Sequence, residues 1–309
     1  MQAVERLECE RGDKNLFDPN ELPEQCEKYM SRFLGCPVRF IRAEALPQSS
    51  RTAPWRLDVQ ANGVLQAYVL QLDPRDMEHE YQALKAVESI PVPTPRAFGL
   101  DLQGEALGVA CFFSEFIKGE SLLGPVQAGE TWAENLYLDT VCTLHSVTDD
   151  DLGEFAQDLD RITAEDVLEE AYTSFKDRSL PLADAVYKKL KQEMPALPEV
   201  RFSNGDLWLD NFLATDRKLA GVIDFQNAAF SDPVFEFLLS FFVSPELQGR
   251  GVEERFCKRI GVNPAILHWY HGLEYFDAWP RLLKTGKNFV HHTSESVEMN
   301  LKKWLEKDD

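Results

Sequence analysis

The stretch at residues 201–225 limits most strongly what this chain can fold into, because polar residues stand at fixed intervals between apolar ones. Asp206 and Asn211 fit a single short loop, and an apolar run typical of a short buried strand ends at Asp224. A hairpin turn through residues 215–218 would return that strand to the loop. We therefore expect the three polar side chains to lie close together.

Two carboxylates and an amide among apolar residues are unstable unless something compensates their charge. Oxygen ligands of this kind suit Mg²⁺ better than zinc. Phosphoryl transfer uses such a set, with one Asp at the acceptor hydroxyl and an Asn and a second Asp on the metal. Taken singly, each residue more often belongs to a polar turn or a surface hairpin, but their joint spacing favours the metal site.

The segment resembles the catalytic core of the aminoglycoside phosphotransferase and choline kinase family, whose members have a protein-kinase-like fold. The family pattern is His-Gly-Asp, four residues, Asn, a short hairpin, and Ile-Asp followed by Trp or Phe. The chain matches it with Asn204-Gly205-Asp206, Asn211 and Ile223-Asp224-Phe225. The resemblance implies that Asp206 is the catalytic base and that Asn211 and Asp224 hold the metal. Asn204 departs from the family histidine.

The resemblance covers about residues 25–290 and implies an α+β fold with two lobes. A small nucleotide-binding lobe, an antiparallel sheet plus one helix, is expected over residues 1–118, of which 1–20 are expected to be irregular. A large, mostly helical lobe that binds the acceptor is expected over residues 119–309. The small-lobe pattern agrees, with a helix at 21–34, strands at 36–45, 55–60 and 64–72, and a hairpin signal at Asn62-Gly63.

The phosphate site departs from the family in two ways. The loop at residues 48–54, which would cover the phosphates, contains no glycine. Gln71 stands where the family places Lys or Arg to hold the α- and β-phosphates, and Glu80 aligns with the helix glutamate that normally pairs with that cation. The resemblance thus implies a Gln71–Glu80 hydrogen bond in place of an ion pair. Both residues also fit an ordinary strand and helix surface.

The hinge between the lobes is expected after the proline-set extended segment 90–96 and two strands near 98–100 and 108–113. In the kinase-like fold, hinge backbone groups pair with the edge of adenine. By resemblance the candidates are Glu115, Phe116 and Ile117, with the lobe boundary near Lys118.

The rest of the chain has the pattern of amphipathic helices. A capping box is predicted at Thr131 and Glu134, and Asp232-Pro233 is predicted to start the helix at 234–243. By resemblance the helix at 263–278 lines the acceptor pocket, where its aromatic and acidic residues would suit an amine. An ordinary core stripe is the plainer interpretation. His291 and His292 are interpreted as surface residues.

The charge composition limits the classes of molecule that the protein is expected to bind. Lys and Arg number 32 against 52 Asp and Glu, a net charge of −20, which argues against nucleic acid and anionic membranes. This charge is compatible with a cationic acceptor, although a solvated acidic surface is the plainer and preferred explanation. The six cysteines form no close pair, no signal peptide is evident, and the longest apolar run is too short to span a bilayer. We expect a cytoplasmic protein.

Together these features predict a phosphotransferase that uses ATP (or GTP) and Mg²⁺ to phosphorylate a hydroxyl of a small molecule. The glycine-poor loop and Gln71 leave open a kinase-like binding protein with weak or no phosphoryl transfer. A third interpretation is a different transfer reaction with the nucleotide reversed in the cleft. The acceptor itself stays open at this stage.

Overall fold

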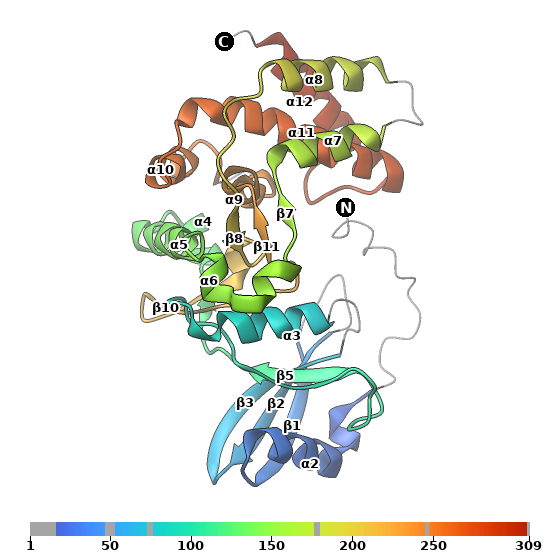
Figure 1. Cartoon of the computed structure of the whole chain (residues 1–309), viewed down its shortest axis with the longest axis vertical. Coiled ribbons are helices and arrows are strands. Elements are labelled where there is room, and N and C mark those ends of the chain that lie inside the picture. The colour runs from blue at the N-terminus through green and yellow to red at the C-terminus, as the bar shows by residue number, and fades with distance from the viewer. Residues whose placement is uncertain (1–16, 47–52, 73–76, 176–179, 245–246, 308–309) are drawn as a thin grey trace.

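The computed structural model describes residues 17–46, 53–72, 77–175, 180–244 and 247–307. A five-stranded sheet lies at one end of the elongated molecule and a group of helices lies at the other, with short strands between them (Figure 1). The expected α+β kinase-like fold is confirmed. Ser49 and Ser50, in the loop expected to cover the phosphates, lie outside the described residues. So do Arg51 and Arg75, either of which could supply the positive charge that Gln71 lacks.

The small lobe is built from antiparallel strands in the order β1-β2-β3-β5-β4. Its strands are β1 (Val38–Ala45), β2 (Trp55–Ala61), β3 (Val64–Gln71), β4 (Ala97–Asp101) and β5 (Cys111–Glu115), and its helices are α2 (Pro23–Leu34) and α3 (Met77–Ala86). The predicted hairpin joins β2 and β3, with Asn62 and Gly63 both at positive φ (48° and 79°). Gly35 ends α2 in the left-handed conformation, as its sequence position predicts.

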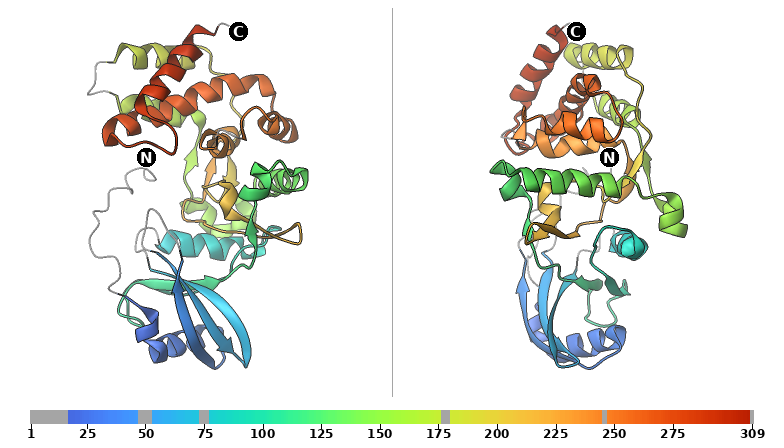
Figure 2. Two further views of the ribbon diagram at one scale, coloured as in Figure 1. Left: turned by 180° about the vertical axis from the view of Figure 1, so that it is seen from behind. Right: turned by 90° about the vertical axis from the view of Figure 1, so that its left-hand side faces the viewer.

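The two faces of this sheet are covered differently. Helix α2 packs its Tyr29 and Met30 against Leu70 and Phe113, whose side chains point to one face. Phe112, the neighbour of Phe113, points to the opposite face and joins the core that contains α3 and the large lobe. The face of the sheet opposite α2 is therefore the one that looks toward the large lobe (Figure 2).

The large lobe contains two small sheets and most of the helices. The sheets are β10-β9-β6 and β7-β11-β8, with strands β6 (Glu120–Ser121), β7 (Arg161–Ile162), β8 (Arg201–Ser203), β9 (Phe212–Thr215), β10 (Lys218–Val222) and β11 (Ala229–Ser231). The α-helices are α4 (Leu123–Gln127), α5 (Thr131–Leu144), α6 (Asp149–Leu152), α7 (Ala164–Thr173), α8 (Pro181–Gln192), α9 (Pro233–Phe242), α10 (Val252–Arg259), α11 (Leu267–Thr285) and α12 (Ser294–Glu306). Short 3-10 helices include Val87–Ser89, Gly153–Asp158, Leu209–Asn211 and Pro264–Ile266. None of the described helices is both long and apolar enough to cross a membrane.

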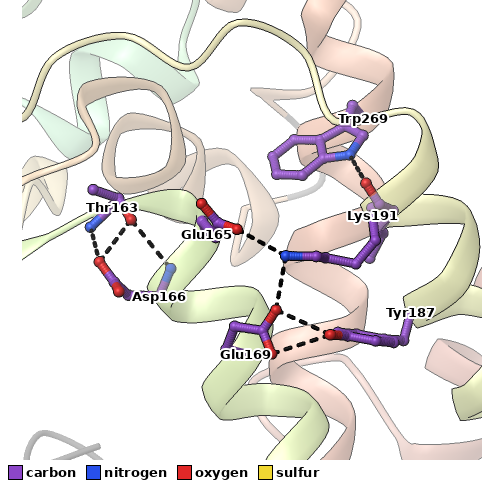
Figure 3. A network of polar contacts seen from close by, with 8 residues as sticks. Thr163, Glu165, Asp166, Glu169, Tyr187, Lys191 and Trp269 are labelled. Atoms are coloured by element: carbon purple, nitrogen blue, oxygen red, sulfur yellow. Dashed lines mark hydrogen bonds and ion pairs between the residues drawn. The ribbon is translucent and has the colours of Figure 1, made fainter.

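Helices α7, α8 and α11 are joined by a polar network near the C-terminal end of the molecule (Figure 3). Lys191 on α8 lies between Glu165 and Glu169 of α7, at 2.7 and 2.9 Å from their carboxylate oxygens. Thr163 caps the start of α7, and Trp269 on α11 donates to the carbonyl of Leu190 at 2.8 Å. This network fixes α11 from one side while α12 packs on it from another.

Two local predictions are wrong. Thr131 is the first helical residue of α5 and Glu130 takes the capping position, so no capping box forms. Glu134 instead turns inward and pairs with Arg250 and Arg255, because a buried carboxylate requires a charged partner. His292 is buried, not exposed, and its Nε2 lies 2.8 Å from the carbonyl oxygen of Phe242.

Candidate active site

The loop at residues 204–211, which is the predicted catalytic loop, connects β8 to β9. It is organised around the backbone carbonyl of Asp206. That oxygen accepts hydrogen bonds from the side-chain amides of Asn204 at 2.9 Å and Asn211 at 3.0 Å. The Asp206 carboxylate accepts a bond from the backbone N–H of Trp208 at 3.3 Å. Because Asn211 uses its amide nitrogen inside the loop, its oxygen Oδ1 is the atom left for a metal.

Asn204 ties this loop to the segment that carries Asp224. The Asn204 side chain is fully buried, and its amide nitrogen also lies 3.2 Å from the carbonyl of Ile223 and 3.1 Å from that of Asp224. The backbone N–H of Ile223 donates to the carbonyl of Asn211 at 2.9 Å. The structure thus brings together the stretches that hold Asp206, Asn211 and Asp224. The sequence showed only that Asn204 replaces a histidine.

Asp224 has a backbone conformation that suits a functional position. Its φ of 60° lies in the left-handed region, which few residues other than glycine adopt. The hairpin before it forms as predicted, with Asp216 and Arg217 at positive φ between β9 and β10. Such strain is retained where the surrounding structure enforces it, and it often marks a ligand site.

The catalytic loop is pressed against the residues that follow Asp224. Gly205 has a φ of 75°, and a Cβ atom there would lie 1.7 Å from the carbonyl oxygen of Asn227. Only glycine fits this position. The Ser203 hydroxyl supports the same loop, since it accepts from the N–H of Gly205 at 3.1 Å and donates to Glu236 on α9.

Glu236 stands where the family places an aspartate. Burial raises the pKa of this carboxyl to about 8, and the bond from Ser203 opposes the rise only in part. The Oε2 atom is buried and has no hydrogen-bond partner among the described residues, although the residue as a whole is partly exposed. The protonated form therefore predominates at neutral pH.

A titration experiment on Glu236 follows from this environment. Because its pKa is higher in the folded than in the unfolded chain, its contribution to stability is complete below about pH 4.5 and is lost as pH rises toward 8. Glu236→Gln cannot ionise, so its stability relative to wild type should increase by about 4 kcal/mol between pH 5 and pH 8.5. Urea unfolding at both pH values measures this. An equal pH dependence in the two proteins would contradict it.

The small lobe adds residues from α3 to the site. Gln71 donates to Glu80 at 3.3 Å, so the hydrogen bond expected between them is present, and Glu80 is buried. His79, which sequence reasoning did not single out, lies with Nε2 at 3.1 Å from the carbonyl oxygen of Ala228. Helix α3 therefore contacts both the Gln71 strand and the segment after Asp224.

The hinge candidates differ in what they can offer a nucleotide. The N–H of Glu115 donates to the carbonyl of Arg96 at 3.0 Å, and the N–H of Phe116 donates to that of Ala67 at 3.1 Å. The Glu115 carboxylate also pairs with Arg96. Among the three candidates, only the N–H of Ile117 has no hydrogen bond to another described residue. This makes Ile117 the strongest candidate for the base edge.

The donor set fits Mg²⁺. Asn211 Oδ1 and the Asp224 carboxylate are both oxygen ligands, and Mg²⁺ commonly takes one or two protein oxygens plus phosphate and water. In the described part of the chain no three His, Cys, Asp or Glu side chains gather as a metal site of their own. A bound nucleotide would therefore have to supply part of the coordination.

The residues of α11 divide into core and polar positions. Trp269, Tyr270 and Trp279 are buried, and Tyr270 donates to Asp232 at 2.8 Å. These aromatics follow the plainer interpretation of a core stripe. Glu274 is buried beside His271, at 3.3 Å, and burial raises the pKa of its carboxyl to about 7.

Comparison with known proteins agrees with the fold. A model of the phosphotransferase enzyme family matches residues 51–281 of the chain. The chain belongs to this family. Among curated protein sequences, none matches it significantly.

Solved structures of similar fold include three phosphotransferases. A protein from Ralstonia eutropha assigned to the aminoglycoside phosphotransferases is 17% identical, with a TM-score of 0.66 over 92% of this chain and 95% of that one. A thermostable mutant of aminoglycoside phosphotransferase APH(4)-Ia, solved with AMP-PNP and hygromycin B, is 16% identical, with a TM-score of 0.64 over 91% and 97%. Macrolide 2′-phosphotransferase type I is 13% identical, with a TM-score of 0.59 over 93% and 97%. At these identities the likeness concerns the fold.

Proposed function

We propose that this chain transfers the γ-phosphoryl group of ATP, with Mg²⁺, to a hydroxyl of a small molecule in the cytoplasm. The observation that carries the proposal is the hydrogen-bonded connection of Asp206, Asn211 and Asp224 through Asn204. Membership of the phosphotransferase family supports phosphoryl transfer as the reaction for this arrangement.

In this mechanism Asp206 orients the acceptor hydroxyl and accepts its proton. Asn211 and Asp224 would hold Mg²⁺, and the ion would neutralise charge on the phosphates. The N–H of Ile117 pairs with the base. The protein contributes mainly placement, so the rigid bonds around Asn204 and Gly205 are what keep the reacting groups in position.

We propose a hydroxylated small molecule that can carry amino groups as the acceptor. A solved relative contains hygromycin B, and another is a macrolide phosphotransferase. The net charge of −20 favours encounter with a cation.

Product analysis tests the proposal directly. The protein is incubated with ATP and Mg²⁺ and a panel of aminoglycosides, macrolides, sugars and amino alcohols, and products are analysed by mass spectrometry. We expect one class to gain a single phosphoryl group. A protein that binds nucleotide but phosphorylates no member of a broad panel would favour the second candidate, a binding protein. Mass spectrometry of the protein itself reports whether it modifies its own chain.

Gln71 is the observation that favours this second candidate, since a neutral amide replaces a cation at the phosphates. Its partner Glu80 is buried and already lies within hydrogen-bond distance. We expect Gln71→Lys to form an ion pair with Glu80 and to tighten ATP binding about five- to tenfold, because charge-assisted bonds are about twice as strong as neutral ones. Calorimetric titration measures this. Unchanged affinity would mean that position 71 does not contact the nucleotide.

A further inference from the structure

Arg56 lies on the face of the small-lobe sheet that looks toward the large lobe. Tyr68 and Leu70 of β3 are buried under α2, so the alternating residues Val69 and Gln71 point to the opposite face. Arg56 on β2 stands directly across from Val69 in the register. Residues directly opposite each other in antiparallel strands share a face. Arg56 therefore projects on the same side as Gln71.

The guanidinium of Arg56 covers the hinge end of this face. Its Cζ atom lies 4.6 Å from the centre of the Phe116 ring. Phe116 is hydrogen-bonded to Ala67, four residues before Gln71 along β3. At about 3.3 Å per residue this is about 13 Å from Gln71. The Arg56 side chain thus extends from the level of Val69, two residues from Gln71, toward Phe116 at the hinge end.

An acidic neighbour holds this guanidinium in place. Arg56 Nε donates to Asp58 at 2.9 Å, and Arg42 Nε donates to the other Asp58 oxygen at 2.7 Å. The Asp58 side chain is 12% exposed and that of Arg56 is 34% exposed. Two guanidinium groups thus share one carboxylate in this cluster, and Glu44 on β1 stands directly across from Arg56 in the register.

We propose that Arg56 forms the roof of the nucleotide base site and stacks its guanidinium plane on the purine. The proposal rests on the phosphotransferase function given above. A guanidinium is planar and weakly hydrated, and it stacks well on π systems. Base sites are lined mainly by apolar and aromatic groups, so a charged roof is tolerated only because Asp58 compensates part of its charge. Stacking contacts the plane of the purine ring and not its edge groups, so it does not distinguish ATP from GTP.

The experiment compares a ligand that has a base with one that has only phosphates, so that contacts to the base are measured separately from contacts to the phosphates. Calorimetry with Mg·ATP and with Mg·tripolyphosphate compares wild type, Arg56→Ala and Arg56→Lys. We expect Arg56→Ala to weaken ATP binding about tenfold, or about 1.4 kcal/mol, and to leave tripolyphosphate binding unchanged. Arg56→Lys keeps the charge but not the plane, so it should recover little. Arg32→Ala is the matched control, because Arg32 also lies over a phenylalanine, 5.2 Å from the Phe33 ring, but on the exposed side of α2.

The outcomes are distinct. Equal losses for both ligands, full recovery by Arg56→Lys, or no loss at all would each overturn the stacking role while the phosphotransferase proposal stood. Wild-type protein that binds no nucleotide would overturn both. Thermal melting of each variant checks that the sheet remains folded.

Discussion

Asp206→Asn should lower phosphoryl transfer at least about 100-fold while leaving nucleotide affinity within about twofold of wild type. The substitution removes the proton acceptor and keeps the shape of the side chain. The bonds from Asn204 and Asn211 go to the backbone carbonyl of residue 206 and survive the change, and the amide oxygen of the new Asn can still accept from the N–H of Trp208. Single-turnover transfer from ATP, with calorimetric binding on the same preparation, separates these two effects.

Asp210→Asn provides the control for this experiment. Asp210 belongs to the same loop but is exposed, and its carboxylate accepts from Trp208 Nε1 at 3.0 Å and from Ser121. We expect its transfer rate to stay within about threefold of wild type, since it makes only exposed polar contacts. Full activity in Asp206→Asn would show that another group accepts the proton.

Gly205→Ala should destabilise the fold by about 4 kcal/mol or more and abolish transfer. The new Cβ atom would overlap the Asn227 carbonyl at 1.7 Å, and the positive φ of 75° adds strain. Gly205 directly follows Asn204, whose side chain joins the loop to residues 223 and 224, so a shift of its backbone would strain these bonds. Urea unfolding measures the loss.

The variant Gly35→Ala is a control that separates the effect of backbone strain from the effect of the steric overlap. Gly35 has a similar φ of 65°, but a Cβ atom added there would have no other atom within 4 Å. This control should cost only about 1–2 kcal/mol. Similar losses at both glycines would show that backbone strain, and not close packing at the catalytic loop, governs position 205.

Several parts of the structure could be predicted because they obey local rules. The hairpin at Asn62-Gly63, the end of α2 at Gly35, and the cap of α9 by Asp232 each depend on residues within a few positions of one another. The fold class, and the approach of the loop at 204–211 to the segment at 223–224, followed from spacing combined with family resemblance.

Other parts depend on contacts that no local pattern contains. Asn204 reaches the carbonyls of residues 223 and 224, and His79 reaches Ala228 across 149 positions. The contact between Arg56 and Phe116 depends on the pairing of β2 with β3 and of β3 with β5. The carboxylate of Glu134 pairs with Arg250 and Arg255 instead of forming the predicted capping box, and these arginines lie more than 100 positions away in the sequence.

The most direct test of the whole interpretation is the Mg²⁺ dependence of ATP binding in wild type and in Asp224→Asn. If Asn211 and Asp224 carry the metal on the phosphates, Mg²⁺ tightens ATP binding to wild type at least about tenfold and has little effect on the variant, because the metal loses its charged protein ligand. ATP binding that responds equally to Mg²⁺ in both proteins would contradict the metal site on which the proposed function depends.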